Sequence, residues 1–105
     1  MSQLIHPRDS RWGTIVREKN NNKCKYCGGI ANGSGHVIPR KRIRTRHVLE
    51  NGISFCCNHH FMFDNHVRFR LHIINILVGK EVYKKLEEIA NGRKTVEECG
   101  FITID

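Results

Sequence analysis

Four residues in the chain have the types and the spacing of a closed metal site. Cys24 and Cys27 form one Cys-x-x-Cys pair, and the run Cys56-Cys57-Asn58-His59-His60 follows further along the chain. Three thiolates and one imidazole are ligands that structural zinc takes in a tetrahedron. The second pair has two frames, Cys56 with His59 or Cys57 with His60. We favour Cys24, Cys27, Cys56 and His59 as the zinc ligands, which leaves His60 for another task.

Two histidines and an asparagine outside this set have the side chains that phosphodiester hydrolysis needs. His36 follows a glycine-rich loop, Asn51 begins an Asn-Gly turn, and His60 comes directly after the second zinc pair. A neutral imidazole can take a proton from water near pH 7, and a second histidine can ligate a divalent cation at a phosphate. An asparagine amide can lock a loop and hold the base in line. Each of the three also has an ordinary structural interpretation, as a strand, turn or helix-surface residue.

A basic segment lies between His36 and Asn51, and the chain as a whole is basic. It has 18 Lys and Arg against 10 Asp and Glu, a net charge of +8. Such a surface attracts polyanions, of which nucleic acid is the first candidate, through phosphate contacts that carry little sequence information. We expect the following residues to bind nucleic acid: Arg40, Lys41, Arg42, Arg44 and Arg46. Arg68 and Arg70 are expected to add backbone contacts, and the alternative is a solvated basic face.

The elements expected around these residues are a hairpin followed by helices. Residues 36–38 have the pattern of a short strand that Pro39 ends, and residues 53–56 alternate like a second strand. A helix is expected from Cys57 or Asn58 to His66. Further helical character is predicted over 67–78, Gly79 breaks it, and residues 81–90 form an amphipathic helix. The lead-in, 1–15, is expected to be irregular, with a short helix from about Thr14 to Lys19.

The composition favours one small domain in a reducing compartment. At 105 residues the core is modest, so a structural zinc would add stability that the core lacks. Five cysteines, two of them adjacent, make a poor disulfide framework. The N-terminus has no apolar segment of the kind found in signal peptides, and the longest apolar run, 73–78, is too short to span a bilayer. We therefore expect a cytosolic (cytoplasmic) protein without a membrane partner.

The stretch from Cys24 to His66 resembles the HNH endonuclease family. The matching segments are CKYC at 24–27, GHVIPR at 35–40 and ENGISFCCNHH at 50–60. The resemblance implies an α+β fold of the ββα-metal type, a treble-clef-like hairpin plus helix with a structural zinc. The single domain, 1–105, would have a motif core over about 24–66 and a helical extension over about 67–105. The Gly-His-x-Ile-x-Arg pattern is also similar to small phage recombination and homing-type members.

The resemblance also implies roles for individual residues. His36 matches the general base, Asn51 the asparagine that orients it, and His60 a ligand of a catalytic Mg²⁺ or Mn²⁺ ion. Many members carry Asp or His directly before the base, where this chain has Gly35. The second ligand of the catalytic ion is therefore open.

Two side chains that follow on the same helix are candidates for this second ligand, His66, which we favour, and Asp64. The departure at Gly35 also leaves open that the site has lost its metal and its activity.

The function that the resemblance implies is a metal-dependent DNA endonuclease that nicks one strand per site. The alternative is a zinc-stapled nucleic-acid-binding module without catalytic activity. The expected partners are DNA and either a second copy of the chain or phage packaging or recombination proteins. Homing and restriction are further roles that the sequence leaves open.

Overall fold

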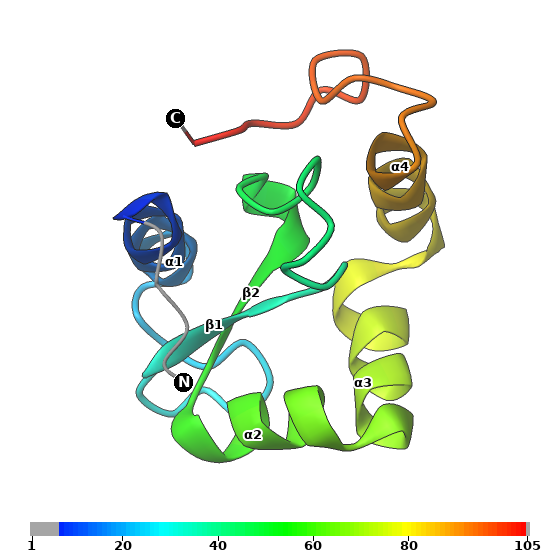
Figure 1. Cartoon of the computed structure of the whole chain (residues 1–105). Coiled ribbons are helices and arrows are strands. Elements are labelled where there is room, and N and C mark those ends of the chain that lie inside the picture. The colour runs from blue at the N-terminus through cyan, green and yellow to red at the C-terminus, as the bar shows by residue number, and fades with distance from the viewer. Residues whose placement is uncertain (1–6, 105) are drawn as a thin grey trace, which may run out of the picture.

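The computed structural model of the protein describes residues 7–104 of the chain, and in this range the fold is α+β. A two-stranded antiparallel sheet is surrounded by helices (Figure 1). In chain order the elements are α1 (Pro7–Lys19), β1 (Gly33–His36), a 3₁₀ turn (Leu49–Asn51), β2 (Gly52–Phe55), α2 (Cys57–Asn65), α3 (Val67–Ile73), a π-helical turn (Ile74–Val78) and α4 (Lys80–Ala90). The predicted bounds of the second strand and of the helix that follows it agree with β2 and α2 to within one residue.

Helix α1 is longer than the sequence analysis predicted, since it begins at Pro7 and not near Thr14. The predicted irregular lead-in is thus wrong from residue 7 onward, and its first six residues lie outside the described range. Proline suits the first position of a helix, where no backbone N–H is required. Trp12 and Val16, four positions apart, are buried together, and the Trp12 indole N–H donates to the Val48 carbonyl at 2.8 Å.

Strand β1 shares only His36 with the strand predicted over 36–38, because the glycine-rich segment before it is itself the strand. Gly33 pairs with Phe55 and His36 pairs with Gly52 in antiparallel register. A Cβ on Gly33 would overlap Nδ1 of His60, and a Cβ on Gly35 would lie 3.0 Å from the ring of Phe55. Glycine is therefore required here for the close approach of α2, although the same residues are ordinarily a loop signal.

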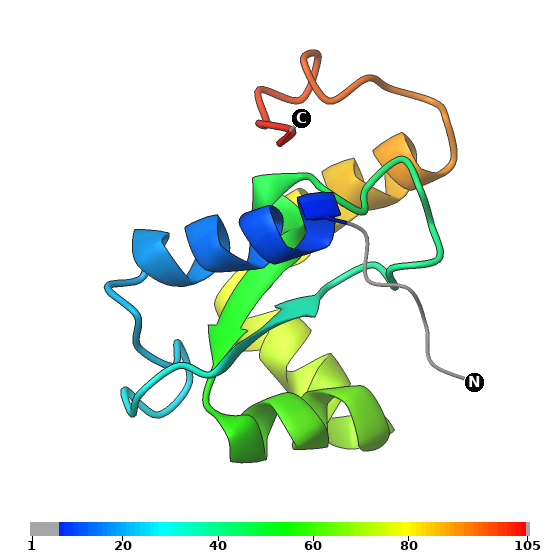
Figure 2. The same cartoon turned by 60° about the vertical axis from the view of Figure 1, so that its left-hand side comes forward.

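Helices α1 and α2 lie on opposite sides of the hairpin (Figure 2). Side chains of a strand alternate between its two faces, so Ser34 and His36 point toward α1 while Gly33 and Gly35 point toward α2. The main hydrophobic core lies on the α2 side and includes the fully buried Phe63.

The C-terminal half follows the predicted pattern. Gly79, with φ of 88°, ends the helical run, and Leu86 and Ile89 of α4 are buried as expected from their spacing. Thr95 and Glu98 form a capping box, because the backbone N–H of each donates to the side chain of the other at 2.8 and 3.1 Å. Cys99 is buried.

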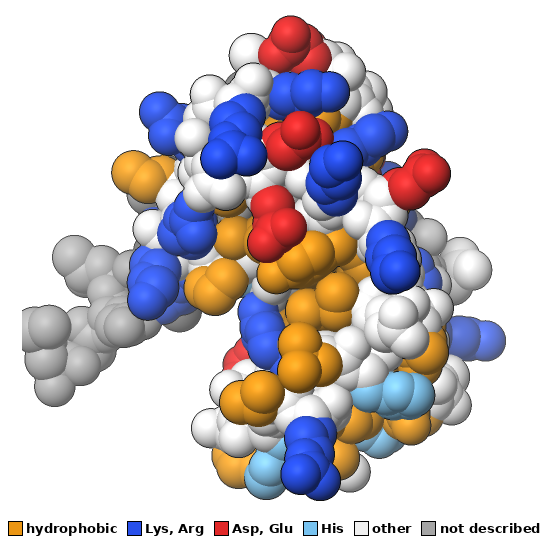
Figure 3. All heavy atoms as spheres, turned by 90° about the vertical axis from the view of Figure 1, so that its right-hand side faces the viewer, with side chains coloured by type: hydrophobic (Ala, Val, Ile, Leu, Met, Phe, Trp, Pro, Cys, Tyr) orange, Lys and Arg blue, Asp and Glu red, His pale blue; other side chains and the backbone are white. Residues whose placement is uncertain are grey.

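On the side of α3 and α4, apolar side chains are exposed between lysines and arginines (Figure 3). Val67, Leu71 and Ile76 are the large exposed apolar residues of α3 and the π-helical turn. Within residues 7–104, no helix combines the length and the apolar character that crossing a membrane requires.

Candidate functional site

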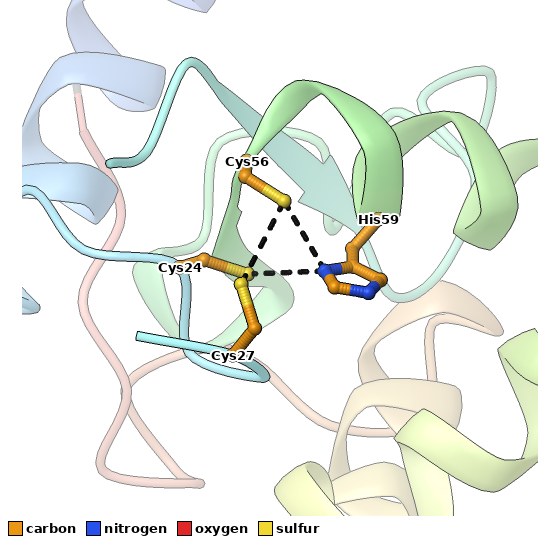
Figure 4. A group of neighbouring side chains, drawn as sticks. All are labelled: Cys24, Cys27, Cys56 and His59. Atoms are coloured by element: carbon orange, nitrogen blue, oxygen red, sulfur yellow. Dashed lines mark hydrogen bonds between the residues drawn. The ribbon is translucent and has the colours of Figure 1, made fainter. Parts of the chain in front are cut away.

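Three cysteines and one histidine converge where the loop after α1 meets the first turn of α2 (Figure 4). The ligand atoms of Cys24, Cys27, Cys56 and His59 all lie within 4.8 Å of one another. Nδ1 of His59 is 3.1 Å from the Cys56 sulfur and 3.8 Å from the Cys24 sulfur. Cys57 is exposed and is not part of the group. The structure thus brings together the four residues of the favoured frame.

This geometry fits a tetrahedral ion. Zinc–sulfur bonds of about 2.3 Å give sulfur–sulfur edges of about 3.8 Å in a regular tetrahedron. The sulfurs of Cys27 and Cys56 are 3.9 Å apart. Gly28, with φ of 79°, turns the chain back so that the Gly29 N–H points at the Cys27 sulfur at 3.4 Å. Three sulfurs and one nitrogen form a closed donor set, which is consistent with structural zinc.

Backbone N–H groups lower the pKa of one of these thiols, and the thiolate is the form that binds a metal. Burial opposes ionisation of Cys24, but the backbone N–H groups of Cys27, Cys56 and Tyr26 stabilise its thiolate and bring its pKa to about 6. The Gly29 N–H favours the thiolate of Cys27, yet the neighbouring sulfurs raise the pKa of this thiol. Thiolates this close repel one another, and a bound cation would remove that repulsion.

A second site is a cleft of about 790 Å³ beside β1. Its walls come from α1, β1, the loop after β1, α2 and α3. Both His36 and His60 line it, although they lie on opposite faces of the hairpin, and His60 takes no part in the metal cluster. The other lining residues are Asp9, Ser10, Trp12, Gly13, Thr14, Arg17, Ser34, Pro39, Arg40, Asp64 and Arg70.

The His36 ring is held between a carbonyl and an indole. Its Nε2 lies 3.0 Å from the Arg46 carbonyl oxygen, and the ring stacks on Trp12 with centroids 4.0 Å apart. Since a carbonyl oxygen can only accept, Nε2 carries the proton and Nδ1 carries the lone pair. Burial lowers the pKa of His36 to about 4, against the Arg46 carbonyl, which favours the charged form. His36 is therefore a neutral, oriented imidazole at neutral pH.

Asn51 is fully buried, and its side chain holds the loop that leads from His36 to the Arg46 carbonyl. Its Oδ1 accepts from the Ile38 N–H at 2.7 Å, and its Nδ2 donates to the carbonyls of Ile38 and Thr45, both at 3.1 Å. These bonds fix the start and the end of the 38–45 loop, whose next residue supplies the carbonyl for His36. Asn51 thus acts on His36 through the backbone.

The structure also places the two candidates for a second ligand beside His60. Asp64 lines the cleft, and its Oδ2 lies 3.4 Å from Nε2 of His60, one helical turn away. His66 is exposed, is absent from the cleft lining and faces the ring of Phe61 instead. The preference for His66 is therefore not supported by the geometry. A side chain at Gly35 would point into Phe55 and Phe63, which explains why no ligand stands there.

The five cations of the predicted basic loop lie in different parts of the structure. Only Arg40 of its five cations lines the cleft. Arg46 is bound by Asp9 at 2.6 Å, and Arg42 donates to the Ala90 carbonyl and the Asn91 amide oxygen at the end of α4. The remaining two lie elsewhere: Arg44 against Gly92, and Lys41 exposed. The guanidinium groups of Arg42 and Arg46 thus already bind other parts of the fold, and the expectation that all five residues contact nucleic acid stays a prediction.

Two charged residues of the cleft, Asp9 and Arg17, come from α1 and were missed in the sequence analysis. Arg46 beside Asp9 holds the pKa of that carboxyl well below its usual range, so Asp9 is ionised and ties α1 to the loop. Asp9, Gly13 and Arg17 are each four residues apart, so they lie on one side of the helix. The helix-initiating Pro7 was the signal that could have revealed them.

Arg70, predicted to contact nucleic acid, also lines the cleft. It donates to the carbonyls of His36 and Val37 at 2.8 and 2.6 Å, and its guanidinium lies 4.3 Å from the centroid of the Phe63 ring. Burial lowers its pKa from the ordinary arginine value. Arg70 therefore supports the backbone of β1 as well as adding positive charge.

Comparisons of the chain with models of known families, with curated proteins and with solved structures returned no match. The resemblance to the HNH family therefore stays a prediction from the quoted motifs.

The metal cluster predicts different outcomes for two adjacent cysteines. Cys56→Ser should lose the bound ion and melt about 10 °C lower or more, because the ion links the loop to α2. Cys57→Ser, the matched control, should keep both. Metal content by mass spectrometry and thermal denaturation measure this. Loss of the ion from Cys57→Ser with retention in Cys56→Ser would assign the other frame.

The environment of His36 predicts a pH dependence of stability. The pKa is about 4 in the folded protein against an ordinary value of 6.5, so the unfolded chain binds the proton first. This contribution is fully present above pH 6.5 and is lost as the pH falls toward 4. Between about pH 7.5 and about 4.5, the wild type should lose about 2 kcal/mol more than His36→Gln in denaturant unfolding. Equal losses would mean that the folded protein leaves this imidazole solvated.

Proposed function

We propose that the protein is a metal-dependent DNA endonuclease of the HNH type, with a structural zinc at the Cys24 cluster and a hydrolytic site in the cleft. The observation that supports this best is that His36 and His60, far apart in the sequence, line one groove. The two rings have different partners, a carbonyl for one and a carboxylate for the other. These partners suit one ring to accept a proton and the other to bind a cation.

His36 acts as the general base in this proposal. Its Nε2–H is committed to the Arg46 carbonyl, so Nδ1 accepts the proton of a water that attacks phosphorus. Trp12 stacks on the ring and, with the Arg46 carbonyl, fixes its plane. Asn51 keeps that carbonyl in place through the buried loop bonds. Because the ring is neutral well below pH 7, it is ready to accept without prior deprotonation.

His60 and Asp64 would hold a divalent ion such as Mg²⁺ or Mn²⁺. Nitrogen and oxygen donors one helical turn apart, 3.4 Å from each other, can share one cation. When bound, such an ion supplies positive charge for the pentacovalent phosphate and for the leaving 3′ oxygen. By resemblance to the family, the products would carry 5′-phosphate and 3′-hydroxyl ends.

The lining of the cleft favours a nucleic-acid backbone as the substrate. Arg17, Arg40 and Arg70 bring three guanidinium groups to it. Among the described residues that line it, Trp12 is the only aromatic side chain apart from the histidines. Trp12 is 2% exposed and is already stacked on His36, so within residues 7–104 the cleft offers no further ring to an unpaired base. Binding to a duplex through phosphates, with little sequence preference, fits this lining.

One such site would nick a single strand, so cleavage of both strands would need a second copy or a second visit. A homodimer, and an accessory role beside phage packaging or recombination proteins, extend the proposal. The exposed apolar side chains of α3 are the surface on which a partner could dock.

A zinc-stapled nucleic-acid-binding module without catalysis is the second candidate. Gly35 favours it, since a ligand side chain there would collide with Phe55 and Phe63 and His60 and Asp64 are left to bind the ion alone. This candidate predicts salt-sensitive DNA binding that survives His36→Ala and no cleavage with any metal.

Nicking of a supercoiled plasmid with Mg²⁺, Mn²⁺ or Ni²⁺ tests the two candidates. His36→Ala should lower the rate by about 10²–10⁴-fold, the usual contribution of a general base. Asp64→Asn should weaken the response to metal, while His66→Ala, the matched control outside the cleft, should retain activity. Circular dichroism of each variant checks the fold. A His36→Ala protein as active as the wild type would overturn the endonuclease proposal.

A further inference from the structure

We infer that Arg17 on α1 is a phosphate-binding residue, which makes α1 one wall of the nucleic-acid site. This inference rests on the proposed function and adds to it a residue outside the segment that resembles the HNH family. Arg17 is half-buried and lines the same cleft as His36 and His60.

The guanidinium of Arg17 is held in place by two hydroxyl groups. Nη1 donates to Oγ of Ser34 and Nη2 donates to Oγ1 of Thr14, both at 3.3 Å. The Ser34 hydroxyl in turn donates to the Gly13 carbonyl at 2.8 Å, which fixes it between strand and helix. The side chain is thus oriented before a ligand binds, which reduces the entropy lost on binding.

These contacts leave the charge of Arg17 without a counterion. Both acceptors are neutral, and within residues 7–104 the guanidinium forms no ion pair with a carboxylate. A guanidinium offers five N–H donors, and two long bonds leave most of that capacity for an anion. Phosphate oxygens would form shorter, charge-assisted bonds than the hydroxyls do.

The neighbouring arginines differ from Arg17 in what their guanidinium groups already bind. Arg46 is neutralised by the bidentate contact with Asp9, and Arg42 binds the end of α4. Arg70 donates from Nη2 to two carbonyls, those of His36 in β1 and of the adjoining residue. Arg17 differs from these three arginines, because both of its hydrogen bonds are long and go to hydroxyl groups.

The position of Arg17 along β1 indicates which phosphate it would bind. Its partner Ser34 and the base His36 stand two residues apart on the same face of the strand, a separation of about 7 Å. A phosphate at Arg17 is therefore a different group from the one attacked at His36. Such a contact would be the same in the bound substrate and in the transition state. It should therefore strengthen substrate binding without raising kcat.

Steady-state nicking kinetics and salt-dependent binding test this inference. Arg17→Gln should raise KM about tenfold, as expected for a lost charge-assisted bond, and leave kcat within about twofold. In duplex binding by His36→Ala protein, which does not cut, the added Arg17→Gln change should reduce the slope of log K against log salt by about 0.9. Arg17→Lys should restore part of the affinity, because the charge returns without the planar fork.

Arg11→Gln is the matched control, since it removes the same charge from the same helix at an exposed position outside the cleft. It should leave KM nearly unchanged. If Arg17→Gln matches Arg11→Gln in an active enzyme, or lowers kcat and not affinity, the inference is wrong while the endonuclease proposal stands. If the wild type neither binds nor nicks DNA, both fail together. Melting temperatures of the Gln and Lys variants show whether either change disturbs the fold.

Discussion

Strand β1 presents glycines to α2 and side chains to α1, and the placement of both histidines follows from this division. On the α2 side, the absence of side chains at Gly33 and Gly35 lets His60 and the core phenyl rings lie against the strand backbone. On the α1 side, His36 reaches Trp12. A strand of four residues thus lies between the two helices, and residues of both helices line the cleft. A larger side chain at either glycine would push α2, and His60 with it, away from His36.

Three cross-links hold this arrangement in a chain with a modest core. The Cys and His cluster joins the loop after α1 to α2, Asn51 closes the 38–45 loop, and the Asp9–Arg46 pair ties α1 to the end of that loop. Each joins segments that are distant in sequence, and each does so through polar groups that would be costly to leave unpaired. The charges that make the loop basic are therefore partly used to hold it in place, so its composition overstates the positive charge left for an anionic partner.

Local features of the structure were predictable from the sequence, and so was the meeting of the two ligand pairs of the metal cluster, but the other contacts between distant segments were not. The Cys56 and His59 spacing, the capping box at Thr95 and the break at Gly79 depend on neighbours within a few residues, and the structure contains all three. Glycines 33 and 35 gave a loop signal because the need for them comes from α2, twenty or more residues away. Likewise, charge alone cannot distinguish Arg40 in the cleft from Arg46 paired with Asp9. Arg17 was missed because its significance depends on the docking of α1 against β1.

The burial that orients His36 would also limit it in the proposed role of a base. A pKa of about 4 keeps the ring neutral, yet a weakly basic imidazole is a poor acceptor at neutral pH. Arg40 adds to this effect, while Asp9 opposes it. A phosphodiester bound in the cleft would bring a negative charge close to the ring and raise the pKa toward its ordinary value. In the proposed reaction the substrate itself would therefore make His36 a stronger base. The arginines that bind the phosphate would neutralise part of its charge and so limit the rise in the pKa of His36. His36 would then be a weak base when the cleft holds a neutral ligand, and a stronger base when an anionic nucleic-acid backbone is bound there.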